Sequence, residues 1–404
     1  MRMVLGLALM AGAGGSLHAQ EHGGPPMPFD HGPERDFGDH PGYDLPERAD
    51  MLATLIDRLA LAEAPERDAH GFPVRRGRIA ATGLSPAALE QAQAAGYRVI
   101  DRTALPSLDQ TITELAVPKG ISARDAAKVV AALDPTAAVD VVHYYGLEPA
   151  GGKPKPIHGP ADMPNRHDAG PPAVIGMIDT TVIAHPALAG AHILPWAEGD
   201  RKGGPVAHGT AVASIIAASG SDPTIYAANI FRGSAERPFT SADVIAQALE
   251  WLVAHHVPVI NMSLAGPRNA LLDRLIEQAV ARGAMVVAAA GNGGPTAPPA
   301  YPAAVPGVIA VTAVDRDLHI YRFANRGPYV AFAASGVDVV AASAPAGMAR
   351  FTGTSFATAH VAAMLARCRA DGHGPAQCLD RLIRSARDLG TPGRDPVYGY
   401  GFVE

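Results

Sequence analysis

The chain has 404 residues, 48% of them hydrophobic, which is enough for more than one folded unit. Its formal net charge is −6 with both signs interspersed, so a large nucleic-acid-binding surface is not expected. Beyond residue 20, no stretch is long and uncharged enough to span a bilayer, and we expect no stable membrane anchor.

Residues 1–20 have the pattern of a short secretory signal peptide. Arg2 supplies the positive start, Val4–Ala13 is a short apolar run, and cleavage is expected after Ala19. This pattern predicts an exported protein, either periplasmic or secreted.

Residues 21–70 are expected to be a linker that is largely disordered. The first part, up to residue 47, is rich in Gly, Pro, His and Asp, which favours a solvated tail over a packed unit. Ala49–Glu66 has helical periodicity and predicts an isolated amphipathic helix.

Residues 71–147 predict a small ferredoxin-like α+β domain, because strands and helices follow in the order strand-helix-strand-strand-helix-strand. Ser85 with Pro86 predicts the start of one helix, and Ser122 with Asp125 predicts the capped start of the other. The predicted elements are Arg78–Thr82, a helix from Ser85 to about Gly96, Tyr97–Ile100, Gln110–Val117, a helix from Ser122 to about Leu133, and Ala138–Tyr144.

Residues 148–170 are rich in Gly and Pro and predict a flexible linker. Residues 171–404 then alternate apolar runs with helical patterns, which predicts an α/β fold with a parallel sheet and helices on both faces. Expected strands are Val174–Ile178, Ile225–Ile230, Val257–Met262, Met285–Ala289 and Val308–Val311; expected helices are Gly209–Ala217, Ala242–His255, Leu271–Arg282 and Ser355–Cys368.

Ser355 lies among small residues at the start of one of these apolar helices. A hydroxyl there sits beside unpaired backbone N–H groups and the positive end of the helix dipole, which suits a nucleophile that attacks a carbonyl. A helix cap is the commoner role for such a serine, so the residues that accompany it decide between the two.

Three further polar residues stand at the ends of buried strands or the start of a helix. Asp179 ends an apolar strand, His208 opens an apolar helix after a Gly-rich loop, and Asn292 follows a strand where a glycine turn begins. A histidine can serve as general base near neutral pH, and an asparagine amide can donate to an oxyanion. Taken singly, each also fits a structural or turn residue.

The chain resembles the subtilisin-like serine proteases, the subtilase family. The resemblance is carried by the order Asp179, His208, Asn292 and Ser355 and by the residues on either side of each. The resemblance implies that Asp179, His208 and Ser355 form a catalytic triad and that Asn292 is the oxyanion donor. It also implies that the segment Ser263, Leu264, Ala265 and Gly266 binds substrate, with a second strand near Gly233–Ala235, and that substrates are proteins or peptides.

The resemblance also gives the N-terminal domain a role, since subtilase propeptides often have this architecture and inhibit their own enzyme. The expected product is therefore a zymogen that cuts itself between Gly146 and Pro172. An accessory domain that stays attached is the alternative. No cofactor is expected and no metal ligand set is evident, whereas structural calcium is compatible with the sequence but not evident from it.

Several positions depart from the family pattern without removing a catalytic group. They are Thr181, Ala211, Ala265, Ser335 and Ala359, and they concern the shape of the pocket. Two other functions are less consistent with the sequence. An esterase or lipase is disfavoured because Ser355 lacks a Gly-x-Ser-x-Gly turn, and an inactive scaffold is disfavoured because all four catalytic groups are present.

Cys368 and Cys378 are the only cysteines, and each adjoins a helical pattern. In an exported protein they are expected to form one disulfide, with two buried free thiols as the alternative.

The resemblance to the subtilase family also implies that the Tyr301–Pro302 bond is cis.

Overall fold

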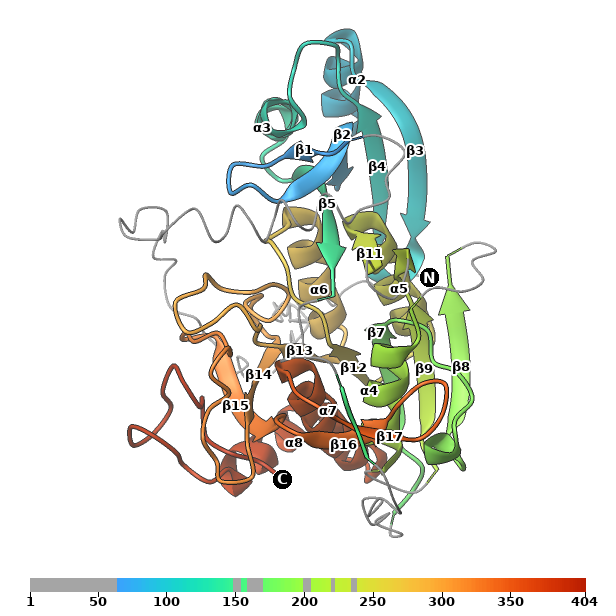
Figure 1. Ribbon diagram of the computed structural model, residues 1–404. Helices are drawn as coiled ribbons and strands as arrows, with labels where there is room; N and C mark the ends of the chain where they lie inside the picture. Colours follow the sequence, from blue (N-terminus) through green and yellow to red (C-terminus); the bar gives the residue numbers. More distant parts are fainter. Residues whose placement is uncertain (1–63, 148–153, 158–169, 199–204, 219–221, 234–237) are drawn as a thin grey trace, which may run out of the picture.

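The computed structural model describes residues 64–147, 154–157, 170–198, 205–218, 222–233 and 238–404 (Figure 1). The predicted signal peptide, the tail and all but the end of the predicted helix Ala49–Glu66 lie outside these residues. The last residue of that helix, Glu66, lies instead in strand β1 (Glu66–Arg67), which pairs with the strand β2 (Pro73–Thr82). The carboxylate of Glu66 accepts hydrogen bonds from the backbone of Gly77 and Ala123, and these contacts hold the segment against the sheet.

The N-terminal region has the predicted strand-helix-strand-strand-helix-strand order, with strands in the spatial order β5-β2-β4-β3 and antiparallel pairing throughout. The caps lie where they were expected: Ser85 Oγ accepts from Ala88 N–H, and Ser122 Oγ accepts from Asp125 N–H. After β2 the elements are α2 (Pro86–Ala94), β3 (Arg98–Leu105), β4 (Gln110–Ala116), α3 (Ala123–Leu133) and β5 (Ala138–Gly146).

The larger region is built on a seven-stranded sheet in the order β15-β14-β13-β12-β7-β9-β8. All of its pairings are parallel. The strands are β7 (Val174–Asp179), β8 (His192–Ala197), β9 (Thr224–Asn229), β12 (Val259–Met262), β13 (Met285–Ala289), β14 (Ile309–Val314) and β15 (Val330–Ser335).

Helices cover both faces of this sheet, as predicted (Figure 1). Alternate residues of each strand face opposite sides, so Met177 joins the core under α4 and α7, whereas Ile178 joins the core under α5 and α6. The helices are α4 (Ala207–Ala218), α5 (Ala242–Ala254), α6 (Ala270–Ala281) and α7 (Thr354–Ala370).

Two strands of the sheet, β8 and β15, were not predicted. β8 contains Pro195, and a proline within an apolar run argues against a strand, but β8 lies at the edge of the sheet, where the missing N–H costs little. β15 has the sequence Val-Ala-Phe-Ala-Ala-Ser, whose alanines give little strand signal.

The two regions share a sheet. The end of β5 pairs antiparallel with β11 (Pro238–Ser241) of the larger region, which in turn pairs with β10 (Arg232–Gly233). Side chains reinforce the junction: Arg75 pairs with Asp243 at 3.2 Å, and the Glu250 carboxylate accepts the backbone N–H groups of Ser107 and Leu108. The N-terminal domain is therefore docked on the larger region through backbone pairing and partly buried polar contacts.

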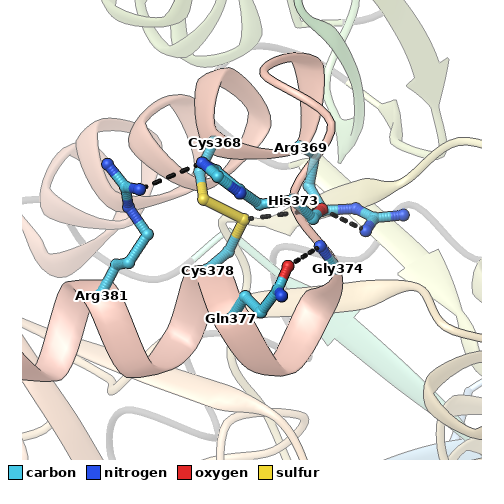
Figure 2. Close-up of a disulfide and its surroundings, with 7 residues drawn as sticks. All are labelled: Cys368, Arg369, His373, Gly374, Gln377, Cys378 and Arg381. Carbon is cyan, nitrogen blue, oxygen red and sulfur yellow. Dashed lines mark hydrogen bonds between the residues drawn. A yellow bond between two sulfur atoms is a disulfide. The ribbon is translucent and has the colours of Figure 1, made fainter.

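The predicted disulfide between Cys368 and Cys378 is present and joins α7 to α8 (Pro375–Ser385) (Figure 2). Around it, Arg369 donates to the His373 carbonyl at 2.7 Å, and Gln377 Oε1 accepts from Gly374 N–H at 3.0 Å. These contacts fix the turn between the two helices.

The predicted cis bond at Tyr301–Pro302 is also present, and Ala344–Pro345 is a second cis bond that the sequence did not suggest.

Among the helices that the structure describes, none is long and apolar enough to cross a membrane. A small three-stranded sheet completes the fold in the order β16-β17-β6, from β16 (Val339–Ala342), β17 (Met348–Phe351) and β6 (Lys155–Pro156).

Candidate active site

Asp179 and His208 are brought together at the carboxyl end of the parallel sheet. Asp179 is the last residue of β7, and His208 lies in the first turn of α4. The Nδ1 atom of His208 is 2.8 Å from Asp179 Oδ1 and 3.0 Å from Oδ2. The aspartate side chain is fully buried, whereas 15% of the histidine side chain is exposed. This arrangement orients the imidazole and leaves its other nitrogen for chemistry.

Thr180 and Gly209 lock these two segments together. The Thr180 hydroxyl accepts a hydrogen bond from Gly209 N–H at 2.8 Å, next to the Asp179–His208 pair. A Cβ atom at position 209 would lie only 2.3 Å from the Thr180 carbonyl oxygen, so the approach requires glycine. The sequence did not single out either residue.

Ser355 lies in the first turn of α7, where backbone N–H groups have no partner within the helix. Its hydroxyl donates to the Ser263 carbonyl at 3.2 Å, and Ser263 Oγ donates in return to the Ser355 carbonyl at 3.0 Å. Asn261 Nδ2 donates to Ser263 Oγ at 2.9 Å, which completes the support. The ring of the next residue, Phe356, lies 5.5 Å from the His208 ring, so the serine turn borders the histidine.

No hydrogen bond joins Ser355 to His208 in this structure. The serine hydroxyl is instead turned toward Ser263. Catalytic hydrogen bonds are often long or misaligned without substrate and tighten in the substrate complex, so this geometry is compatible with a triad.

Asn292 is held against the start of α7. Its Oδ1 atom accepts from both the backbone N–H and the hydroxyl of Thr354, each at 3.0 Å. Because both groups donate to this atom, it is the oxygen of the Asn292 amide. The donor atom Nδ2 therefore lies on the opposite side of the amide group. A Cβ atom at Gly353 would lie 3.5 Å from Nδ2, which places this donor beside the serine turn.

The predicted substrate-binding segment follows β12. Ser263, Leu264 and Ala265 are buried, and Gly266 forms a two-bond antiparallel bridge with Tyr301, with N···O distances of 2.8 and 3.1 Å. Tyr145 of the N-terminal domain packs against Gly266 so closely that a Cβ there would lie 2.4 Å from its ring. The end of the N-terminal domain therefore lies on the segment that was expected to bind substrate.

The second expected strand, near Gly233–Ala235, falls partly outside the described residues. Gly233 belongs to β10, and residues 234–237 are not described. The strand that receives β5 is its hairpin partner β11, which the sequence did not predict.

Within the described part of the chain, one group of side chains has metal-ligand geometry, formed by Asp315, Asp317 and His319. The Asp315 Oδ1 atom accepts from the backbone N–H groups of both Asp317 and His319, so it already serves the turn. Nothing in the donor set points to a particular cation.

Residues 170–401 match the sequence model of the Subtilase family. With this match over more than half of its length, the chain belongs to the subtilase family of serine endopeptidases.

Individual relatives agree with this assignment. The minor extracellular protease Epr of Bacillus subtilis is 34% identical over 206 residues, which cover 49% of this chain but 32% of Epr. Subtilisin Savinase of Lederbergia lenta is 32% identical over 254 residues, covering 59% of this chain and 91% of that protein. The alkaline protease of Alkalihalobacillus alcalophilus is matched over 64% of its length, so the chain spans less than two thirds of two of these three relatives.

Among solved structures, fervidolysin from Fervidobacterium pennivorans superposes with a TM-score of 0.64 at 19% identity and covers 82% of this chain and 60% of that one. At this identity the likeness concerns the fold alone. Because 82% exceeds the share of the chain matched by the family, the shared fold extends into the N-terminal domain.

Proposed function

We propose that this protein is an exported serine endopeptidase, periplasmic or secreted, which is made as a zymogen and cuts its own chain. Asp179, His208 and Ser355 act as the triad, and Asn292 is the side-chain donor to the oxyanion. Proteins or peptides are the substrates. The observation that carries the proposal is the hydrogen-bonded pair of Asp179 and His208 beside a helix-terminal serine.

In the proposed reaction, His208 takes the proton of Ser355 while the serine oxygen attacks the peptide carbonyl. Asp179 holds the Nδ1–H tautomer and stabilises the imidazolium that forms. The negative charge on the carbonyl oxygen is met by Asn292 Nδ2 and by backbone N–H at the start of α7, where the helix dipole adds to the stabilisation. His208 then returns the proton to the leaving amine.

We further infer that the N-terminal domain is a propeptide and an inhibitor of its own enzyme. Two observations support this inference. The end of β5 pairs antiparallel with β11, and Tyr145 covers Gly266. A docked domain on the substrate segment would exclude protein substrates until it leaves. A permanently attached accessory domain remains the competing proposal, and the two differ in whether the linker is cut.

The test is to produce the wild-type chain and Ser355→Ala side by side, without other proteases, and to sequence the N-termini. We expect the wild type to yield a new N-terminus between Gly146 and Pro172, active on casein, and the variant to remain uncut. Mixing a trace of mature enzyme with the variant separates a missing nucleophile from a misfolded site, because a folded precursor is then cut at the same bond. A variant that matures normally on its own would contradict self-processing.

A further inference from the structure

Asn261 is a polar residue in the middle of the large sheet. It lies in β12, which is paired with β7 on one side and β13 on the other, and its side chain is completely buried. The residues before and after it, Ile260 and Met262, belong to the core under α5 and α6. Because successive side chains of a strand point to opposite faces, the Asn261 amide points to the α7 side of the sheet.

The Asn261 amide, the Ser263 hydroxyl and the Ser355 carbonyl form a directed chain of hydrogen bonds. The Ser355 carbonyl can only accept, so the Ser263 hydroxyl donates its single proton to it, at 3.0 Å. Ser263 Oγ then accepts from Asn261 at 2.9 Å, and the atom that faces it is the donor Nδ2. The orientation of the amide therefore sets the direction in which the Ser263 hydroxyl points.

The other end of the Asn261 amide destabilises the fold. Its Oδ1 atom is buried, and within the part of the chain that the structure describes it has no hydrogen-bond partner. A buried polar atom without a partner lowers the free energy of unfolding, and an apolar side chain of similar size would avoid this loss. The contact with Ser263 therefore explains the amide better than the stability of the sheet does.

We propose that Asn261 is a positioning residue for the nucleophile Ser355. Its Nδ2 group directs the Ser263 hydroxyl to the Ser355 carbonyl, and this bond fixes the backbone of the nucleophile against β12. Asn261 acts through the Ser263 hydroxyl alone. The proposal rests on the proposed function, because it assigns a supporting residue to the same catalytic serine.

A fixed backbone matters because the Ser355 hydroxyl has to change partners during the proposed reaction. In this structure it donates to the Ser263 carbonyl at 3.2 Å, whereas attack requires that it turn to His208. Rotation of the side chain brings the oxygen to the right place only if the backbone of Ser355 stays where it is. Small displacements of a reacting group lower the rate steeply, so loosening this backbone should slow the chemical step.

The test is a double-mutant cycle on mature enzyme, made of Asn261→Val, Ser263→Ala and the two changes combined. Asn261→Val removes both the donor and the unpartnered oxygen, and valine suits a strand. Ser263→Ala removes the hydroxyl but keeps the backbone carbonyl. Precursors that mature slowly are cut by a trace of tagged parent enzyme, which is then removed.

We expect each single change to lower kcat by about two- to tenfold, which corresponds to the loss of one hydrogen bond. KM should stay within about twofold of the parent, because the backbone that is expected to bind substrate is unchanged. The combined variant should be no slower than Ser263→Ala alone, since Asn261 has no effect once the Ser263 hydroxyl is gone.

Two further measurements separate positioning from a merely structural role. The rate at which a small sulfonyl fluoride labels Ser355 should fall by about the same factor as kcat, because the reagent reacts with the nucleophile directly. The melting temperature of Asn261→Val, measured in a Ser355→Ala background, should be unchanged or higher, because the buried unpartnered oxygen is gone.

Thr312→Val is the matched control. Thr312 is completely buried in β14, and its hydroxyl also lacks a partner among the described residues. Its neighbours Val311 and Ala313 belong to the core under α4 and α7, so Thr312 points to the opposite face, away from Ser355. This variant should leave kcat and the labelling rate unchanged.

Losses that add in the combined variant would overturn the proposal, as would normal kcat and labelling in a folded Asn261→Val enzyme. Asn261→Ala repeats the cycle with a smaller side chain, so that overpacking by valine cannot imitate the expected result. If neither variant folds, Asn261 is a structural residue and the proposal is wrong. If the parent enzyme neither cuts peptides nor reacts with the sulfonyl fluoride, the proposed function itself fails.

Discussion

Thr354 holds the Oδ1 atom of Asn292 with two hydrogen bonds, one from its backbone N–H and one from its hydroxyl. Both donors belong to the first turn of α7, one residue before Ser355. The amide is therefore oriented by the same turn that carries the proposed nucleophile. Any movement of this turn changes the donor and the nucleophile together, which makes their relative geometry robust.

Gly209→Ala should disrupt the junction between the proposed base and its aspartate. The new Cβ would meet the Thr180 carbonyl at 2.3 Å, and backbone cannot yield as a flexible side chain does. Overpacking of this kind costs about 1–3 kcal/mol, so we expect a lower melting temperature and a large loss of self-processing. Gly347→Ala is the control for glycine loss, since no atom lies within 4 Å of a Cβ there, although its positive φ adds some strain. Normal stability and processing in the Gly209→Ala variant would contradict this role.

Removing the disulfide with Cys368→Ala and Cys378→Ala should lower stability without abolishing the fold. The bridge closes a loop with a sequence separation of 10 residues, for which chain entropy predicts up to about 3 kcal/mol. Chemical denaturation of the double variant in a Ser355→Ala background measures the loss without autolysis. Titration of the unfolded, unreduced parent should find no free thiol, and two thiols per chain would show that the bridge does not form.

His360 and Asp273 should change the free energy of unfolding with pH in opposite directions. His360 Nε2 is buried without a hydrogen-bond partner among the described residues, and burial lowers the pKa of His360 to about 4. Between about pH 6.5 and 4 the unfolded chain then binds the proton first, so this group makes the protein less stable as the pH falls. For Asp273, burial raises the pKa to about 6 despite its contact with Arg268, so this group makes the protein less stable as the pH rises from about 4 to 6.

The measurement is the free energy of unfolding between pH 4 and 7, again in a Ser355→Ala background. His360→Met should remove the loss toward acid, and Asp273→Asn should remove the loss toward neutral pH, so the two variants tilt the profile in opposite directions. Each group can contribute at most about 3 kcal/mol across its window. Profiles that tilt the same way in both variants would rule out this pair of assignments.

The sequence predicted most of the features that follow from local sequence patterns rather than from contacts between distant segments. Apolar runs located most of the large sheet and its four main helices, and caps located the two helices of the N-terminal domain. The order of Asp179, His208 and Ser355 indicated the candidate site. What it missed depends on contacts between distant segments. Thr180 and Tyr145 carry no local signal. Each matters because a glycine in a distant segment, Gly209 or Gly266, lets it approach closely. β8 carries a proline and β11 has only four residues, and the pairing of both strands comes from their neighbours rather than from their own composition.

Asn292→Ala should slow peptide hydrolysis while leaving substrate binding largely intact. The oxyanion exists only along the reaction path, so a donor aimed at it stabilises the transition state more than the bound substrate. We expect turnover to fall by about a hundred- to a thousandfold, the range known for the corresponding donor of subtilisin, with a small change in KM.

A purely structural role makes a different prediction for the same variant. Since Asn292 Oδ1 also holds Thr354, loss of the amide could loosen α7 and lower stability, with turnover of the folded fraction almost unchanged. Thr354→Val is the matched control, because it removes the hydroxyl donor but keeps the amide and the backbone bond. Turnover, KM and melting temperature should be measured together on processed enzyme. A folded Asn292→Ala enzyme with near-normal turnover would remove this residue from the mechanism, whereas slow turnover at an unchanged melting temperature, with Thr354→Val close to the parent, would establish it as the oxyanion donor.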